Sequence, residues 1–151
     1  DIAQEKVFVP AKAGGPAPHG QATDGSGLLV DPPGGELLAA IGKERGPIEK
    51  GMDIEAVEGG LRMLGQGMGM VRDFHLKERE GRLVLRVEYG GLRAACKAIR
   101  AEMPDTCRQL QCVGCSCILT AVARAADKAV TVEKVDNSED RVVFTLSLSE
   151  W

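Results

Sequence analysis

Four of the five cysteines stand close together in the segment CRQLQCVGCSC, residues 107–117. They are Cys107, Cys112, Cys115 and Cys117, with the spacing C-x4-C-x2-C-x-C. Thiolates are good ligands for zinc and for iron–sulfur clusters, and the first three cysteines match the run found in plant-type ferredoxins. Either Cys117 or Cys96 would supply the fourth ligand. One hypothesis is therefore a zinc or iron–sulfur site.

The surrounding residues favour a helix, which argues against one site for all four thiols. The stretch VGCSCILTAVARAA reads as a buried helix from about Cys112 to Asp127. On a helix Cys112 and Cys115 share a face, whereas Cys117 points about 200° away from Cys115. A second hypothesis is that these small residues let the helix pack tightly on a sheet. A third is that thiols line a ligand pocket or act in redox chemistry.

Other residues carry weaker signals. GQGMGM, residues 65–70, has the glycine density of a phosphate loop, but it leads from a predicted helix into a predicted strand, the reverse of the phosphate-binding order. We interpret it as a tight connection. The histidines, His19 and His75, are not adjacent to any cysteine, so cysteine-nucleophile catalysis lacks a base. We expect His75 to be exposed, on the strand face of Val71 and Asp73.

Hydrophobic periodicity predicts the elements that position these residues. Apolar residues recur at helical spacing in 36–44, in a segment that Asp53 caps, in 91–103 before Pro104, and in 112–127. Two hairpins alternate with period two: one turns at 79–81, and the other at 137–140. The order from Asp53 predicts an α+β domain with helices packed on one face of an antiparallel four-stranded sheet of two hairpins.

Residues 1–35 differ in composition from the rest of the chain. They are rich in Gly, Pro and Ala, with short β-like runs at KVFVP and GLLV. Such a segment forms an extended arm more easily than a packed element. We therefore divide the chain into an arm, residues 1–35, and an α+β domain, residues 36–151.

Composition disfavours several classes of partner. The net charge is −3, the basic residues are interleaved with acidic ones, and aromatic residues make up 3%, so we expect no nucleic-acid partner. No window of about 18 apolar residues occurs, so we expect no membrane partner for this chain. The odd number of cysteines and their crowding favour a reducing, cytoplasmic compartment.

Two segments, GMGMVRDFHLKEREGRLVLRVEY and CVGCSCILTAVARAADKAVTVEKVDNSEDRVVFTLSL, resemble the 4-vinyl reductase domain family. This family comprises small-molecule-binding modules related to subunits of the transport-particle tethering complex. The resemblance covers about residues 53–148. It places Cys112, Ser116 and Thr120 at the family's helix positions, Glu133 at its strand glutamate, and Phe144 on its last strand.

The chain departs from the family pattern in its cysteines. Where the family often has further cysteines that join a metal site, this chain has Asp136 and Val142. The resemblance therefore does not carry a metal across. A metal, if bound, would need the local cysteines as its ligands.

The resemblance, the aliphatic composition and the lack of a catalytic constellation together predict a non-enzymatic module that binds or senses a small hydrophobic molecule, as a homodimer. The predicted pocket wall consists of Met63, Met70, Cys96, Cys112 and Cys115. One alternative is a zinc or iron–sulfur protein using Cys107, Cys112, Cys115 and Cys117. Another is a structural or assembly domain whose arm docks on a neighbour.

Overall fold

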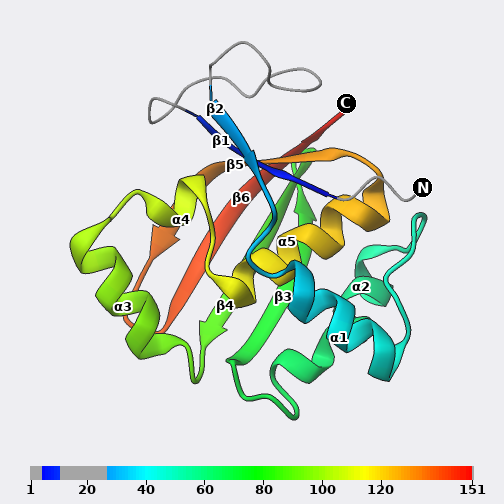
Figure 1. Ribbon diagram of the computed structural model, residues 1–151, viewed down its shortest axis with the longest axis horizontal. Helices are drawn as coiled ribbons and strands as arrows, with labels where there is room; N and C mark the ends of the chain where they lie inside the picture. Colours follow the sequence, from blue (N-terminus) through cyan, green and yellow to red (C-terminus); the bar gives the residue numbers. More distant parts are fainter. Residues whose placement is uncertain (1–4, 11–26, 151) are drawn as a thin grey trace.

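A computed structural model describes residues 5–10 and 27–150 (Figure 1). His19 and most of the predicted arm lie outside the described residues. The elements, in chain order, are β1 (Val7–Pro10), β2 (Gly27–Val30), α1 (Gly35–Arg45), α2 (Ile54–Gly60), the 3-10 helix η1 (Arg62–Leu64), β3 (Val71–Arg79), β4 (Arg82–Tyr89), α3 (Arg93–Glu102), α4 (Thr106–Gln109), α5 (Val113–Ala126), β5 (Ala129–Asn137) and β6 (Arg141–Ser149).

The main sheet is antiparallel and four-stranded, with the order β3-β4-β6-β5. The two predicted hairpins lie side by side, and β4 pairs with β6 in a register that sets Leu85 opposite Phe144. Strand residues at alternate positions of β4 and β6 are buried, which gives the sheet one apolar face. The predicted α+β class and the four-stranded sheet are confirmed.

Helices α1, α2 and α5 lie on one face of this sheet (Figure 1). Most of α5 is buried, and its side chains join those of the sheet in one apolar core. A helix that is apolar nearly all round is covered on more than one side, and α1 packs against α5. The fully buried residues of this core include Leu38, Ile41, Leu61, Leu64, Leu85, Ile118, Phe144 and Leu146. The buried helix from Cys112 onward is confirmed.

The first hairpin turns at Glu80 and Gly81, which have φ angles of 53° and 76°. Positive φ at both central residues is the two-residue turn that matches strand twist. A bulge between Val71 and Asp73 shifts the register of β3 against β4. Val71 is therefore buried while His75 is exposed, so the prediction that these two residues share a face is wrong.

Helix α2 begins as predicted but ends early. The Asp53 side chain caps it by accepting a hydrogen bond from the backbone N–H of Ala56 over 2.8 Å. A Cβ on Gly60 would meet Ile48 at 2.8 Å, and the chain continues as the 3-10 helix η1 after that close contact. GQGMGM then connects η1 to β3, as predicted.

The described part of residues 1–35 is ordered into a small sheet. Strands β1 and β2 pair antiparallel, with Val7 opposite Val30. Just before β1, Glu5 forms an ion pair with Arg124 of α5, with an Nε–Oε1 distance of 2.7 Å. The predicted β-like runs therefore pair with each other, and this segment contacts the helical layer of the same chain.

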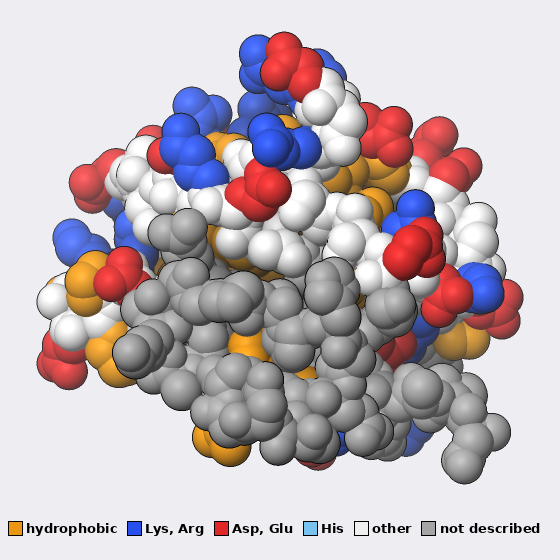
Figure 2. All heavy atoms as spheres, turned by 90° about the horizontal axis from the view of Figure 1, so that it is seen from above, with side chains coloured by type: hydrophobic (Ala, Val, Ile, Leu, Met, Phe, Trp, Pro, Cys, Tyr) orange, Lys and Arg blue, Asp and Glu red, His pale blue; other side chains and the backbone are white. Residues whose placement is uncertain are grey.

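Positive and negative side chains are mixed on the surface. Figure 2 shows blue Lys and Arg beside red Asp and Glu over the described part of one face. Among residues 5–10 and 27–150, no helix is both long enough and apolar enough to cross a membrane.

Candidate functional site

An apolar cavity of about 200 Å³ lies where α3, α4 and the start of α5 meet. Its walls come from three segments of the chain. The lining residues are Pro33, Cys96, Ile99, Thr106, Cys107, Leu110, Gln111 and Cys112. Three of these residues are cysteines, so a molecule bound in the cavity would lie beside thiol groups.

Local backbone geometry places Cys112 at the entrance to α5. Its φ and ψ are −64° and 170°, the extended conformation of an N-cap residue, and its carbonyl accepts a hydrogen bond from Ser116 N–H over 2.8 Å. The Cys112 side chain makes no capping hydrogen bond to the first turn. The backbone N–H groups of Gly114 and Cys115 nevertheless lower the pKa of this thiol, because the N-terminus of a helix favours negative charge.

Two further thiols reach Cys112, and we call Cys96, Cys112 and Cys115 the thiol cluster. The Sγ atoms of Cys96 and Cys112 are 3.9 Å apart. Cys115, one turn further along α5, hydrogen-bonds to the same sulfur. All five cysteines of the chain are free thiols.

Cys107 reaches the cavity because the short helix α4 turns the chain back. The Leu110 N–H donates to the Thr106 carbonyl over 2.7 Å, and the Gln111 side-chain amide donates to the Cys107 carbonyl over the same distance. These bonds hold the segment between α3 and α5 in a compact turn. Cys107 thereby lines the cavity beside Cys96 and Cys112.

The hydrogen bonds of the thiol cluster shift the pKa values of its three thiols in different directions. Donation from the Cys115 thiol, then from the Cys96 thiol, lowers the pKa of Cys112 far below that of an ordinary thiol. The pKa values of Cys96 and Cys115 are raised, first because each donates to Cys112 and then because each is buried. Burial also raises the pKa of Cys107. The directions of these pKa shifts make Cys112 the thiol of the cluster that ionises most readily.

A cation from α3 lies beside this cluster. The Arg100 side chain donates from Nε to the Cys96 carbonyl over 3.3 Å, and its guanidinium lies 5.3 Å from the centre of the Tyr89 ring. The positive charge of Arg100 lowers the pKa of Cys96 and of Cys107. The effects that raise these two pKa values are larger, so both pKa values remain raised. Arg100 thus adds positive potential near Cys96 and Cys107.

The structure brings together only part of the predicted pocket wall. Cys96 and Cys112 line the cavity, and Cys115 contacts Cys112 from behind. Met63 and Met70 do not line it, because η1 and the start of β3 place them against the core. Sequence reasoning missed six wall residues: Pro33, Ile99, Thr106, Cys107, Leu110 and Gln111, of which Cys107 was predicted only as a metal ligand. Thr106 lies in helix α4, and Leu110 and Gln111 follow it directly. This helix has only four residues, too few to show the hydrophobic periodicity of a helix in the sequence.

Cys117 does not belong to the thiol cluster. It is 0% exposed, and its pKa is raised to about 12 by burial, with Arg124 as the charged group that opposes the effect. In the part of the chain that the structure describes, no group of three or more His, Cys, Asp or Glu is arranged to hold a metal ion. The zinc or iron–sulfur alternative therefore stays a prediction from the cysteine spacing alone.

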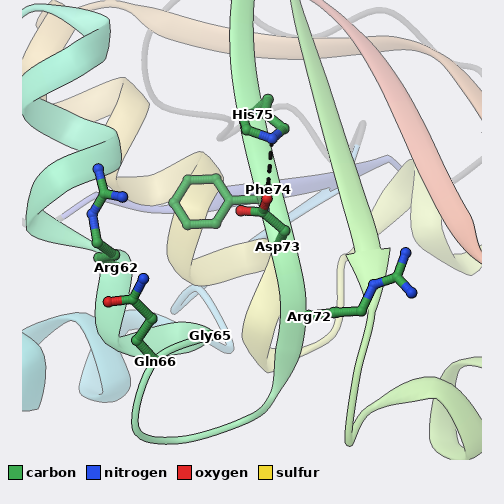
Figure 3. A pocket seen from close by; sticks show the side chains of 7 residues that line it. All are labelled: Arg62, Gly65, Gln66, Arg72, Asp73, Phe74 and His75. Atoms are coloured by element: carbon green, nitrogen blue, oxygen red, sulfur yellow. Dashed lines mark hydrogen bonds and ion pairs between the residues drawn. The ribbon is translucent and has the colours of Figure 1, made fainter.

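A second hollow, of about 240 Å³, lies on the surface between η1 and β3. Its lining residues are Arg62, Gly65, Gln66, Arg72, Asp73, Phe74 and His75. Figure 3 shows His75 above Asp73, with an Nε2–Oδ2 distance of 3.1 Å, while Arg72 points away from Arg62 and Gln66. None of the seven is a Ser, Thr or Cys, the residues that a neighbouring base most often activates as nucleophiles.

Comparisons of the chain with protein-family models, with curated proteins and with solved structures give no match. The resemblance to the 4-vinyl reductase domain family therefore remains a hypothesis carried by the residues quoted for it. Of those residues, Cys112 is the N-cap residue of α5, the Thr120 hydroxyl donates to the Ser116 carbonyl over 2.7 Å, and Phe144 lies in the core. Glu133 pairs with Arg82 over 2.7 Å.

Proposed function

We propose that this protein binds a small apolar molecule in the cavity between α3, α4 and α5. The observation that carries the proposal is the cavity itself, about 200 Å³ in volume and walled largely by carbon and sulfur atoms. An enclosed apolar cavity of about 150 Å³ in another protein binds benzene, and the present cavity is of similar volume but partly open to solvent. The volume supports a ligand of about the size of benzene or slightly larger.

The same proposal includes a non-enzymatic sensing or carrier role, a reducing cytoplasmic compartment and a homodimer. The free thiols support the compartment, because such thiols persist where glutathione and thioredoxin keep them reduced. The homodimer and kinship with the 4-vinyl reductase domain rest on the sequence resemblance alone. Sedimentation of the purified chain measures the oligomeric state directly.

Thermal melts with benzene, toluene and indole test the binding proposal. A ligand that binds only the native state at about 100 times its Kd stabilises by about 2.7 kcal/mol. For a domain of this size that corresponds to a rise in Tm of about 5–10 °C. At least one of these probes should produce such a rise.

A cavity-filling variant separates binding in the cavity from binding elsewhere. Leu110→Trp places a large side chain where the ligand would lie, so it should abolish the Tm shift. Leu28→Trp is the matched control, because Leu28 is 70% exposed on β2 and does not line the cavity. Absence of any shift in the wild-type protein, or an equal shift in Leu110→Trp, would refute the proposal.

A further inference from the structure

The thiol cluster combines features that a packing role does not require. Cys112 and Cys115 form a C-x-x-C pair, and Cys112 is the N-cap residue of a helix of 14 residues. A helix N-terminus stabilises a thiolate, and C-x-x-C cysteines in that position are the reactive ones in disulfide oxidoreductases. The third thiol, Cys96, comes from a different helix and lies 3.9 Å from Cys112.

The cavity gives small molecules a route to this sulfur. Cys112 is only partly buried and lines the cavity, whereas Cys115 is buried in the core. A molecule in the cavity can therefore reach Cys112, whereas it cannot reach Cys115. Cys96 lines the same cavity, so it can reach an intermediate formed there.

Helix α3 can bring Cys96 the remaining distance. A disulfide needs the two sulfur atoms to approach from 3.9 Å to about 2.05 Å. Cys96 is the only buried residue of α3, so few packed side chains oppose a small shift of this helix. Cys115 has no such freedom, because α5 is embedded in the core.

We infer that Cys112 is the nucleophile in thiol–disulfide exchange with a small disulfide, and that Cys96 resolves the mixed disulfide. This inference is independent of the proposed apolar ligand, since it depends only on the sulfur positions and on access to Cys112. The substrate class is a low-molecular-weight disulfide. The site would make the protein a dithiol sensor or reductant of such molecules.

The exchange balances in two steps. The Cys112 thiolate attacks one sulfur of the disulfide RSSR, which breaks the S–S bond, forms Cys112–S–S–R and releases one RS⁻. Cys96 then loses its proton to water and attacks the Cys112 sulfur, which forms the Cys96–Cys112 disulfide and releases the second RS⁻. The two cysteines lose two electrons in total, and the small disulfide gains them.

The test uses the reduced full chain and the aromatic disulfide 5,5′-dithiobis(2-nitrobenzoate), whose thiol product absorbs at 412 nm. We expect a fast phase that releases about two equivalents of product per chain from the two exchange steps. The rate of this phase should change less than about twofold between pH 6 and pH 8. An ordinary thiol would react about tenfold faster per pH unit in this range, because its thiolate fraction rises by that factor.

Three cysteine variants assign the steps. Cys112→Ser should remove the fast phase, and Cys96→Ser should keep it but stop at about one equivalent, with the mixed disulfide detectable by mass. Cys117→Ala is the matched control, because Cys117 is fully buried, does not line the cavity and does not hydrogen-bond to Cys112. It should behave like the wild type.

Peptide mapping of the oxidised wild-type protein identifies the bond without any variant. After digestion with trypsin, the fragment 94–97, which holds Cys96, should remain joined by a disulfide to the fragment 109–124, which holds Cys112, Cys115 and Cys117. Sequencing the joined peptide by tandem mass spectrometry should then assign the second sulfur to Cys112. A bond between Cys112 and Cys115 would overturn the assignment of Cys96. First reaction at Cys107, or equal reaction of all thiols with a rate that follows pH, would overturn the nucleophilic role of Cys112.

Discussion

The backbone N–H of Gly34 donates a hydrogen bond to the Ser116 hydroxyl over 2.9 Å, at a point where α1 and α5 touch. Gly34 is the residue before α1, and Ser116 lies in the first turns of α5. The two helices approach closely here because neither residue carries a bulky side chain. The sequence analysis proposed that the small residues at the start of α5 let this helix pack tightly on the sheet. The structure shows that they also let it pack closely against α1.

Replacing Gly34 by Ala should destabilise the protein strongly. A Cβ at this position would lie 2.1 Å from the backbone nitrogen of Cys117, which cannot move without disturbing α5. We expect a loss of about 3 kcal/mol, the upper part of the usual range for overpacking, measured by urea denaturation. Gly59→Ala is the control, because an added Cβ there meets no atom within 4 Å and helix propensity improves. Equal stability of both variants would contradict this close contact.

Ser116→Ala should lower stability without any steric clash. The change removes the acceptor for Gly34 N–H in a buried environment, and an unsatisfied buried donor costs about 1–3 kcal/mol. Thermal melts at pH 7 measure the loss. Ser138→Ala, at an exposed turn, should change stability by less than about 0.5 kcal/mol. A neutral Ser116→Ala would mean that water satisfies Gly34.

The two cysteines of the C-x-x-C pair should respond differently to Ser. Cys112→Ser should be close to neutral, because Ser is among the preferred N-cap residues. Cys115→Ser buries a hydroxyl in the core and should cost about 1–3 kcal/mol if that hydroxyl lacks a partner. Cys115→Ala should cost about 1–2 kcal/mol through lost volume. Metal ligation predicts instead that Ala and Ser are equally damaging at both positions, which the same melts would reveal.

Tyr89 should ionise only in strong alkali. Burial raises its pKa to about 12, and the nearby Arg100 charge opposes this only in part. Tyr89 is the only tyrosine, so tyrosinate absorbance at 295 nm reports on it alone. Because the folded pKa lies above the unfolded value, this group's contribution to stability is complete below pH 10 and is lost as the pH rises through about 12. An inflection near pH 10 in the folded protein would contradict the burial of Tyr89.

The ion pair between Glu5 and Arg124 should stabilise the docking of the β1–β2 sheet. The hydrogen bond from Arg124 lowers the pKa of Glu5, so its contribution is present above the unfolded pKa and is lost as the pH falls through the folded one. Glu5→Gln should cost about 1 kcal/mol at pH 7 and progressively less in acid. Asp31→Asn, which removes the exposed partner of Lys6, is the control and should be nearly neutral. A cost that does not depend on pH would exclude this mechanism.

The main sheet and its helices could be predicted from the sequence because their signals are local. Alternation in residues 82–89 and 141–148 placed Leu85 and Phe144 on the buried face, and Asp53 was identified as a cap from its position before an apolar stripe. These patterns depend only on the two- and 3.6-residue periods of strands and helices. The bulge that buries Val71 could not be seen, because it depends on how β3 pairs with β4.

The sequence by itself also determined that Cys112 and Cys115 lie on one face of the helix and that Cys117 lies on another. Residues three apart in a helix are neighbours on its surface, whereas residues five apart are not. Only the tertiary structure decided which other thiol joins them. Cys96 and Cys112 are separated by a helix end, α4 and a turn, and their meeting depends on how α3 packs across the start of α5. Such a contact between distant residues is determined by the packing of whole elements, which no local period encodes.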